Sequence, residues 1–168
     1  QYSKMICLYG ELSGVETLCH LMVISEMEEA IISIPNPFNQ DTVIDLYLTL
    51  DRDTINKVEL VNNSPYISTD IKINAKILSS EKNSNYFEKD NLELIKNYAS
   101  SYVKSNVEDY LYKTSKEFKS DIDLFGRYAV KYFGTWDKWL EYNWLDNYQN
   151  SFFDVNVDLD VVSSYLIS

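Results

Sequence analysis

The side chain best suited to acid–base chemistry is His20, because imidazole titrates near neutral pH. It is the single histidine in 168 residues, so a histidine zinc site or a serine–histidine triad would have to be built around it alone. His20 directly follows Cys19 and has apolar neighbours. On a strand, adjacent side chains point to opposite faces, which disfavours a Cys19–His20 dyad. We therefore expect His20 to be a buried or half-buried structural residue.

Thiols and carboxylates are the other groups that could carry chemistry. Cys7 and Cys19 both lie in apolar runs, where thiols act as small hydrophobes, and neither resembles a lipidated cysteine. Asp154, Asp158 and Asp160 would share one face of a strand, which resembles a cation cluster. Exposed strand faces are commonly acidic, so we expect this one to be solvated.

Glycine usage argues against nucleotide binding. Only four glycines are present, and no phosphate-binding loop or dinucleotide fingerprint occurs. The 26 acidic residues leave an acid–base pair of the glycosidase kind open, but no specific pair can be named. The sequence therefore predicts no catalytic residue, metal or cofactor, and an enzyme remains an alternative that requires an unforeseen carboxylate pair in a cleft.

Charge and composition limit the class of protein. The net charge is −11 at pH 7, which opposes binding to phosphate backbones, so nucleic acid is not expected as a partner. Apolar residues make up 45% of the chain and aromatic residues 14%, which is enough apolar surface to fold rather than remain disordered. No apolar run is long enough to span a bilayer.

Aromatic side chains crowd the last third of the chain. They are Tyr128, Tyr132, Trp136, Trp139, Tyr142, Trp144 and Tyr148. On a helical wheel Trp136 and Trp144 lie on one side, and we expect both to pack inward. Trp139 diverges from that side, which makes it the candidate exposed contact for a protein partner or a sugar.

Alternating apolar residues predict the strands that would position these groups. The predicted strands cover 5–9, 30–34, 43–50, 55–61, 67–78 and 155–161. Residues 11–24 read as a helix that runs into a strand. Prolines 35 and 37 predict a loop at 35–37, because proline breaks both helices and strand ladders. Turn residues at 51–53 and 62–65 separate the middle strands, as in an antiparallel meander.

A helical period begins at Asp90, which forms with Glu93 the pattern of a capping box. It continues for about 28 residues, with apolar side chains on one half of the helical wheel. We expect this apolar face to be buried against the sheet. Two further helices are predicted at 121–132 and 135–147. The sequence thus predicts an α+β fold in which a mostly antiparallel sheet packs around a long amphipathic helix, with additional C-terminal helices and a final strand. No linker divides the chain, so we expect one domain over 1–168.

The segment after the long helix resembles a known family. Asp121, Ile122, Phe125 and Gly126 match the D-I-F-G-F-G-like stretch of the Ger(x)C spore germination lipoproteins, the C subunits of nutrient germinant receptors. In that family the stretch follows a long helix, as it does here. The order of strands and helix also agrees over nearly the whole chain, and the resemblance implies a sheet that curves around the helix.

Downstream positions extend the resemblance. Lys131 and Tyr132 match the family's K-Y-P-like step, Trp136 and Trp144 match its spaced tryptophans, and an alternating valine strand follows. The chain departs from the family at three positions. They are Asp123 in place of the first aromatic residue, Leu124 in place of the first glycine, and Phe133 where proline is usual.

The resemblance implies a non-enzymatic receptor subunit that acts in germination through protein assembly. It implies membrane-embedded A and B subunits as partners, with other germination proteins left open. It also implies a location on the outer side of the spore inner membrane, through a lipidated cysteine outside this soluble segment. Because the chain starts at Gln1, we expect it to be a fragment of that longer lipoprotein. The alternative is an extracytoplasmic module that binds a small ligand or glycan through exposed aromatic residues.

Overall fold

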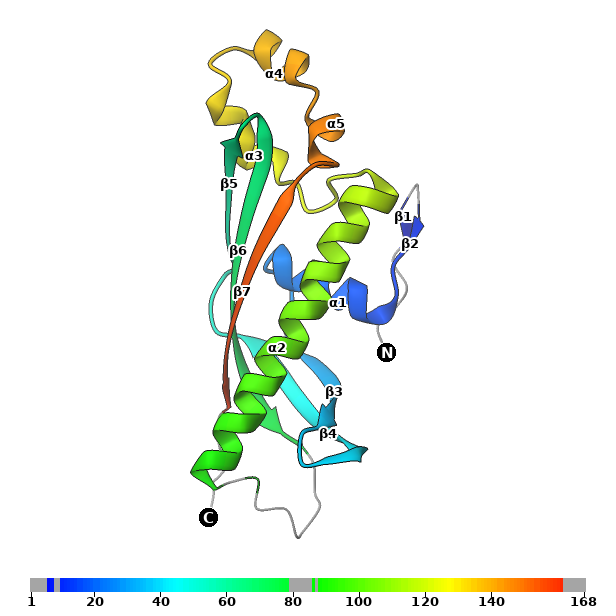
Figure 1. Ribbon diagram of the computed structural model, residues 1–168, viewed down its shortest axis with the longest axis vertical. Helices are drawn as coiled ribbons and strands as arrows, with labels where there is room; N and C mark the ends of the chain where they lie inside the picture. Colours follow the sequence, from blue (N-terminus) through cyan, green and yellow to red (C-terminus); the bar gives the residue numbers. More distant parts are fainter. Residues whose placement is uncertain (1–5, 8–9, 79–85, 87, 162–168) are drawn as a thin grey trace.

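The computed structural model describes residues 6–7, 10–78, 86 and 88–161. The molecule is elongated, with a long helix running diagonally across a twisted sheet (Figure 1). Short helices sit at one end of the sheet, and the β3–β4 hairpin lies at the other end. This arrangement is the α+β fold predicted from the sequence, with a long helix, C-terminal helices and a final strand.

The N-terminal part forms a small hairpin followed by a helix. Strands β1 (Ile6–Cys7) and β2 (Gly10–Glu11) pair antiparallel. Helix α1 (Gly14–Val23) begins with a capping box, in which Ser13 and Glu16 bind each other's backbone N–H groups. The prediction that 11–24 ends as a strand is therefore wrong. Cys19 and His20 lie on a helix, and both are buried; the side chain of Cys7 lies outside what is described.

Five strands form the main sheet. They are β3 (Ala30–Asn36), β4 (Asn39–Leu50), β5 (Ile55–Val61), β6 (Ser64–Ile77) and β7 (Phe152–Val161). Strand β6 is the centre: β7 runs parallel to it along one edge. Two antiparallel strands pair with the other side of β6. Strand β5 pairs with the first half of β6, and β4 pairs with the second half. Strand β3 pairs with β4 and completes the sheet.

Two turns define the antiparallel part. Asn62 and Asn63 have φ angles of 50° and 67°, as a tight two-residue hairpin requires, and β6 begins directly after them. The predicted loop at 35–37 is wrong in its first two residues. Pro35 pairs with Val43 in the ladder, and the turn starts only at Pro37. Proline is tolerated there because β3 is an edge strand among the described strands and the register shifts just after it.

Helix α2 (Lys89–Lys113) covers the sheet and ends in a π-helical turn, Thr114–Phe118. Its buried residues form one face, and they meet the inner face of β7 and helix α1. They are Ile95, Ala99, Val103, Val107, Tyr110 and Leu111. The helix begins after Glu88, so Asp90 lies inside the first turn and the predicted capping box with Glu93 does not form among the described residues.

The C-terminal helices are shorter than predicted. Residues 121–125 form a turn, and helix α3 starts only at Gly126 (Gly126–Ala129), followed by a 3₁₀ turn, Val130–Tyr132. The predicted helix at 135–147 is two helices, α4 (Trp136–Tyr142) and α5 (Trp144–Tyr148). They are separated by Asn143, whose φ of 51° interrupts the helix. We call residues 126–148 the C-terminal lobe.

Candidate functional site

Asp121 organises the turn that leads into the C-terminal lobe. Its Oδ1 accepts a hydrogen bond from the backbone N–H of Phe125 at 2.8 Å, and its Oδ2 accepts one from Gly126 at 2.7 Å. The same Oδ2 accepts the indole N–H of Trp144 at 2.8 Å. Burial raises the pKa of Asp121 above its usual range, while these three hydrogen bonds pull it down. One carboxylate therefore fixes both the start of α3 and the side chain of α5.

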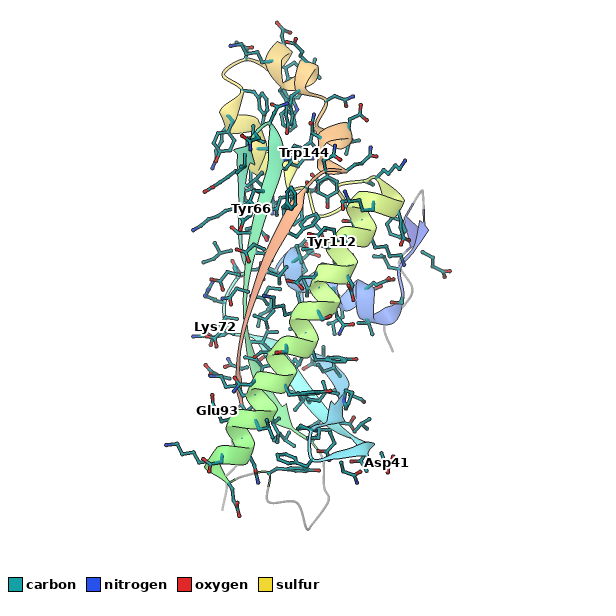
Figure 2. The ribbon with its side chains drawn as sticks, in the orientation of Figure 1. Asp41, Tyr66, Lys72, Glu93, Tyr112 and Trp144 are labelled. Atoms are coloured by element: carbon teal, nitrogen blue, oxygen red, sulfur yellow. The ribbon has the colours of Figure 1, made fainter. Side chains whose placement is uncertain are left out.

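Gly126 and Trp144 lie in direct contact. A Cβ atom added at Gly126 would stand 2.9 Å from the Trp144 Nε1, so only glycine leaves room for the indole. Trp144 is buried, and Figure 2 shows it at the junction between the lobe and the end of the sheet. Beneath it, Phe125 is fully buried and stacks on Tyr148 with ring centroids 6.4 Å apart.

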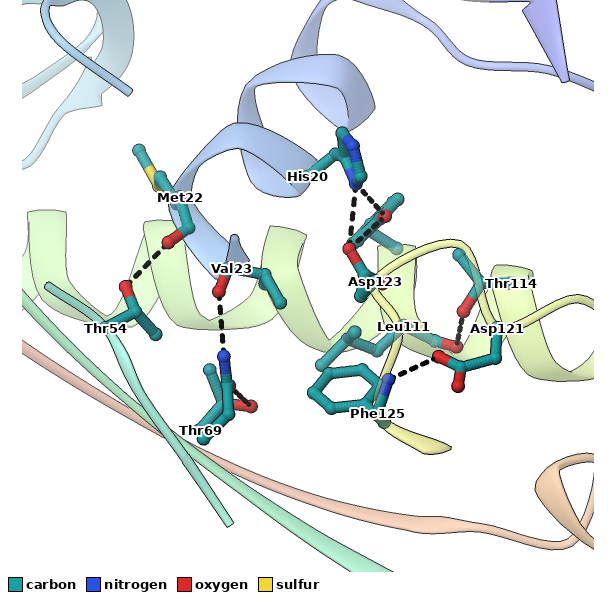
Figure 3. A network of polar contacts seen from close by, with 12 residues as sticks. His20, Met22, Val23, Thr54, Thr69, Leu111, Thr114, Asp121, Asp123 and Phe125 are labelled. Carbon is teal, nitrogen blue, oxygen red and sulfur yellow. Dashed lines mark hydrogen bonds and ion pairs between the residues drawn. The ribbon is translucent and has the colours of Figure 1, made fainter. Parts of the chain in front are cut away.

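A second buried cluster joins three elements. His20 on α1 places Nδ1 at 2.8 Å from Asp123 Oδ1 and at 3.0 Å from the Tyr110 hydroxyl of α2. Tyr110 donates to the same Asp123 oxygen at 2.8 Å. Figure 3 shows His20 pointing toward Asp123. Burial raises the pKa of Asp123, opposed by the hydrogen bond and charge of His20. All three residues are buried, so the cluster is closed to a substrate and ties the 121–125 turn to α1 and α2.

Sequence reasoning missed this cluster. His20 was correctly predicted to be a buried structural residue, but its partners lie 90 and 103 positions away. The available signal was Asp123, a carboxylate in a motif position where an aromatic residue was expected. A carboxylate that replaces an apolar residue at a buried position needs a hydrogen-bonding or charged partner there, because an unpaired buried charge is costly.

The C-terminal lobe is fixed to the β5–β6 hairpin, both along β5 and at the tip. The Tyr132 hydroxyl donates to the Val58 carbonyl, and the Tyr142 hydroxyl donates to the Asn63 carbonyl, each at 2.9 Å. Inside the lobe, Phe133 packs on Trp139 and Tyr142 with centroid distances of 5.4 and 4.6 Å. The lobe thus has its own aromatic layer, in which Trp139 is half-buried.

Two large apolar side chains lie exposed on the outer surface of the lobe. Trp136 is 64% exposed and Leu140 59% exposed. The prediction that Trp136 packs inward is therefore wrong. Helix α4 instead directs Trp139 and Tyr142 toward the interior of the lobe. Lys131 is exposed beside Tyr132, 5.1 Å from its ring centroid. Trp136, rather than Trp139, is the prominent exposed aromatic side chain of this surface.

The acidic face of β7 shows no cation site. Asp154 accepts from Tyr66 at 3.0 Å and Asp160 pairs with Lys96 at 2.8 Å. Across the part of the chain that the structure describes, no group of three His, Cys, Asp or Glu residues could hold a metal ion. No helix of the described residues is long and apolar enough to cross a membrane.

Comparison with known proteins decides the family. Residues 4–165 match the family described as "Spore germination B3/GerAC like, C-terminal". The chain belongs to this family. Its fold is also that of the protein in "Crystal Structure of the GerBC protein", with a TM-score of 0.71 at 15% sequence identity. The match covers 91% of this chain and 47% of the GerBC chain, so the chain spans about half of that protein's length. No curated protein matches the sequence.

Two departures from the family pattern, Leu124 and Phe133, can be explained by the local structure. Leu124 stands where glycine was expected and has a φ of 61°, a left-handed conformation that favours glycine. A glycine at this position would therefore adopt the observed turn with less strain than leucine. At position 133, phenylalanine instead of proline contributes a ring to the aromatic layer of the lobe.

Proposed function

We propose that this chain is a non-enzymatic domain of a spore nutrient germinant receptor C subunit, which acts in germination through protein–protein assembly. The match to the spore germination B3/GerAC-like family over residues 4–165 carries this proposal. The fold shared with the GerBC protein supports it.

The distribution of side chains favours an assembly role. The buried His20 cluster is enclosed, whereas the large exposed apolar side chains of the lobe, Trp136 and Leu140, face outward from a scaffold fixed by Asp121 and Trp144. Exposed tryptophan on a rigid support is typical of protein interfaces. We infer that the lobe is the part of the domain that contacts other subunits.

The proposed partners are the membrane-embedded A and B subunits of the receptor. In the full-length protein, a lipid anchor outside this segment would hold the domain on the outer side of the spore inner membrane. This location rests on the family match and the Ger(x)C motif positions of the sequence.

Affinity capture tests the proposal. Tagged full-length protein, extracted from spore membranes in mild detergent, should retain both the A and the B subunit. A washed, untagged preparation serves as the control. Absence of both subunits from the captured material under every germination condition would contradict the proposed assembly role.

A second function, binding of a small ligand or glycan, is favoured by one observation. Trp136 borders a shallow depression that is also lined by Val130, Lys131 and Thr135, and tryptophan beside a hollow can stack on a sugar ring. A thermal-shift screen of sugars and amino acids would detect such binding. A stabilising ligand whose effect is lost in Trp136→Ala would support it, and a flat screen would argue against it.

A further inference from the structure

The exposed surface of the lobe is a stripe on helix α4. Trp136 and Leu140 are four residues apart, so they lie on the same side of the helix, one above the other. The adjacent side of α4, with Trp139 and Tyr142, packs on Phe133. Among the described residues no side chain covers the stripe, and both residues are more than half exposed. We call Trp136 and Leu140 the α4 stripe.

A hollow continues the stripe. The depression beside Trp136 has a volume of about 310 Å³ and is lined by Val130, Lys131, Phe133, Gly134, Thr135 and Trp136. A Cβ atom added at Gly134 would meet nothing within 4 Å, so the space beside Gly134 is open. The hollow is large enough for an aliphatic or aromatic side chain of a partner.

Two acidic residues edge the stripe. Asp137 and Glu141 each follow a stripe residue, are four positions apart, and are exposed. In the described part of the chain, no ion pair engages either of them. Their like charges repel each other mildly, which a cation placed between them would relieve.

The charge of the lobe differs from that of the whole chain. Its basic residues, Arg127, Lys131 and Lys138, are matched in number by its acidic residues, Asp137, Glu141 and Asp146. The chain as a whole carries −11, so the excess negative charge lies outside the lobe. The lobe is therefore a place where a partner can approach an apolar surface without facing the net charge of the domain.

We propose that the α4 stripe and its hollow bind a polypeptide segment of a membrane-embedded receptor subunit that presents aliphatic or aromatic side chains next to a Lys or Arg. This inference rests on the proposed function. The apolar side chains fill the hollow and cover Trp136 and Leu140, and the basic residue lies between Asp137 and Glu141. The acidic edge complements a basic side chain of a polypeptide, whereas an extended anionic bilayer would face the net charge of −11 of the whole domain.

Capture of the A and B subunits by variants of the full-length protein tests the inference. Trp136→Ala/Leu140→Ala should lower the affinity for the subunits by at least about tenfold, since buried tryptophan anchors dominate interfaces. Asp137→Lys/Glu141→Lys keeps the apolar stripe but should weaken capture by about fivefold or more at low salt, through repulsion of the basic residue. Ile31→Ala/Val43→Ala is the matched control, because it removes exposed apolar side chains from β3 and β4 at the other end of the molecule.

The outcomes separate this inference from the proposed function. If the wild type retains both subunits and all three variants do so equally, the receptor role stands and the α4 stripe is not the docking site. If the wild type retains neither subunit, both fail. Unchanged capture combined with loss of binding to phosphatidylcholine–phosphatidylglycerol vesicles in Trp136→Ala/Leu140→Ala would assign the stripe to lipid and overturn the inference. Circular dichroism of each variant checks that the fold is retained.

Discussion

Asp121, Gly126 and Trp144 show how single residues shape the lobe. The carboxylate of Asp121 accepts one hydrogen bond from each of the other two residues. At Gly126 the indole of Trp144 comes so close that an added Cβ atom would stand 2.9 Å from its Nε1. The three residues belong to the motif that resembles the Ger(x)C family. Their contacts explain why these residue types occur together in this chain.

Gly126→Ala should destabilise the domain, because the new methyl group would stand 2.9 Å from Trp144 Nε1 and force the indole off Asp121. We expect a loss of about 1–3 kcal/mol in the free energy of unfolding, measured by urea denaturation. Gly134→Ala is the matched control, because a Cβ there meets nothing within 4 Å, and it should change stability by less than about 0.5 kcal/mol. Equal effects of the two substitutions would contradict the contact.

Leu124→Gly should stabilise the domain. Leu124 has a φ of 61° and is 59% exposed, so glycine would relieve strain of about 1–2 kcal/mol with little loss of packing. The greater freedom of glycine in the unfolded chain offsets part of this gain, which leaves about 0.5–1 kcal/mol. Leu145→Gly, an exposed helical leucine, should instead lose about 1 kcal/mol. A loss of stability in both variants would rule out the strain at position 124.

At the scale of elements, buried polar groups hold α1, α2 and the 121–125 turn together. His20, Tyr110 and Asp123 form one cluster, and Thr114 at the end of α2 bonds to the Tyr148 hydroxyl of α5 at 2.8 Å. Breaking one member of such a buried cluster leaves the others unpaired, which costs more than the bond itself contributes. These contacts therefore fix how the lobe and α1 are placed against the long helix.

The same burial predicts sensitivity to alkaline pH. Burial raises the pKa of the Cys19 thiol to about 12, and it raises the pKa values of Tyr110 and Tyr148 as well. Unfolding would return these groups to ordinary values of about 8.5 for cysteine and 10 for tyrosine. As pH rises, the unfolded chain therefore loses these protons at a lower pH than the folded chain does. The contribution of the three protonated groups to the free energy of unfolding is complete below about pH 8.5 and declines as pH rises above it.

Urea denaturation between pH 7 and 11 measures this effect. Tyr148→Phe loses the bond to Thr114 and should be less stable at pH 7, but its stability should fall less steeply above about pH 10. Parallel pH profiles of the wild type and Tyr148→Phe would show that Tyr148 does not carry the predicted linkage.

Elements with a clear period were predictable from the sequence. Strand β5 was predicted at its observed bounds, and α2 with its π-helical end was found almost in full, because each buries one face and exposes the other. Helix α1 was missed as a continuous helix, since residues 17–20 are all buried, including the polar Thr17 and His20, so no exposed polar side marks a helical period there. The helix predicted from Asp121 failed because the Asp121 carboxylate and the left-handed Leu124 make a turn there.

The candidate surface was harder to predict than the fold. A helical wheel treats α4 and α5 as one helix, but Asn143 breaks them and rotates Trp144 inward independently of Trp136. Only the contacts of Phe133, Trp139 and Tyr142 decide which side of α4 faces out. The motif residues, in contrast, could be named from the sequence, although their hydrogen bonds could not.

At the scale of the whole molecule, the long sheet and α2 separate two ends. The β3–β4 hairpin lies at one end and the C-terminal lobe with the α4 stripe at the other (Figure 1). The family match covers 4–165, so both ends belong to the unit shared with other GerAC-like proteins. We propose that this unit is a single domain over 1–168, with the apolar stripe at one end.

Nutrient-triggered germination of spores is the most direct test of the account. Spores that lack the gene are complemented with the wild type, with Trp136→Ala/Leu140→Ala or with Ile31→Ala/Val43→Ala, and the fall in optical density after nutrient addition is recorded. We predict that the wild type and the Ile31/Val43 control restore the response, whereas the stripe variant and the uncomplemented spores do not respond. A normal nutrient response in spores that lack the gene, for every nutrient that triggers the parent strain, would contradict the role as a germinant receptor subunit.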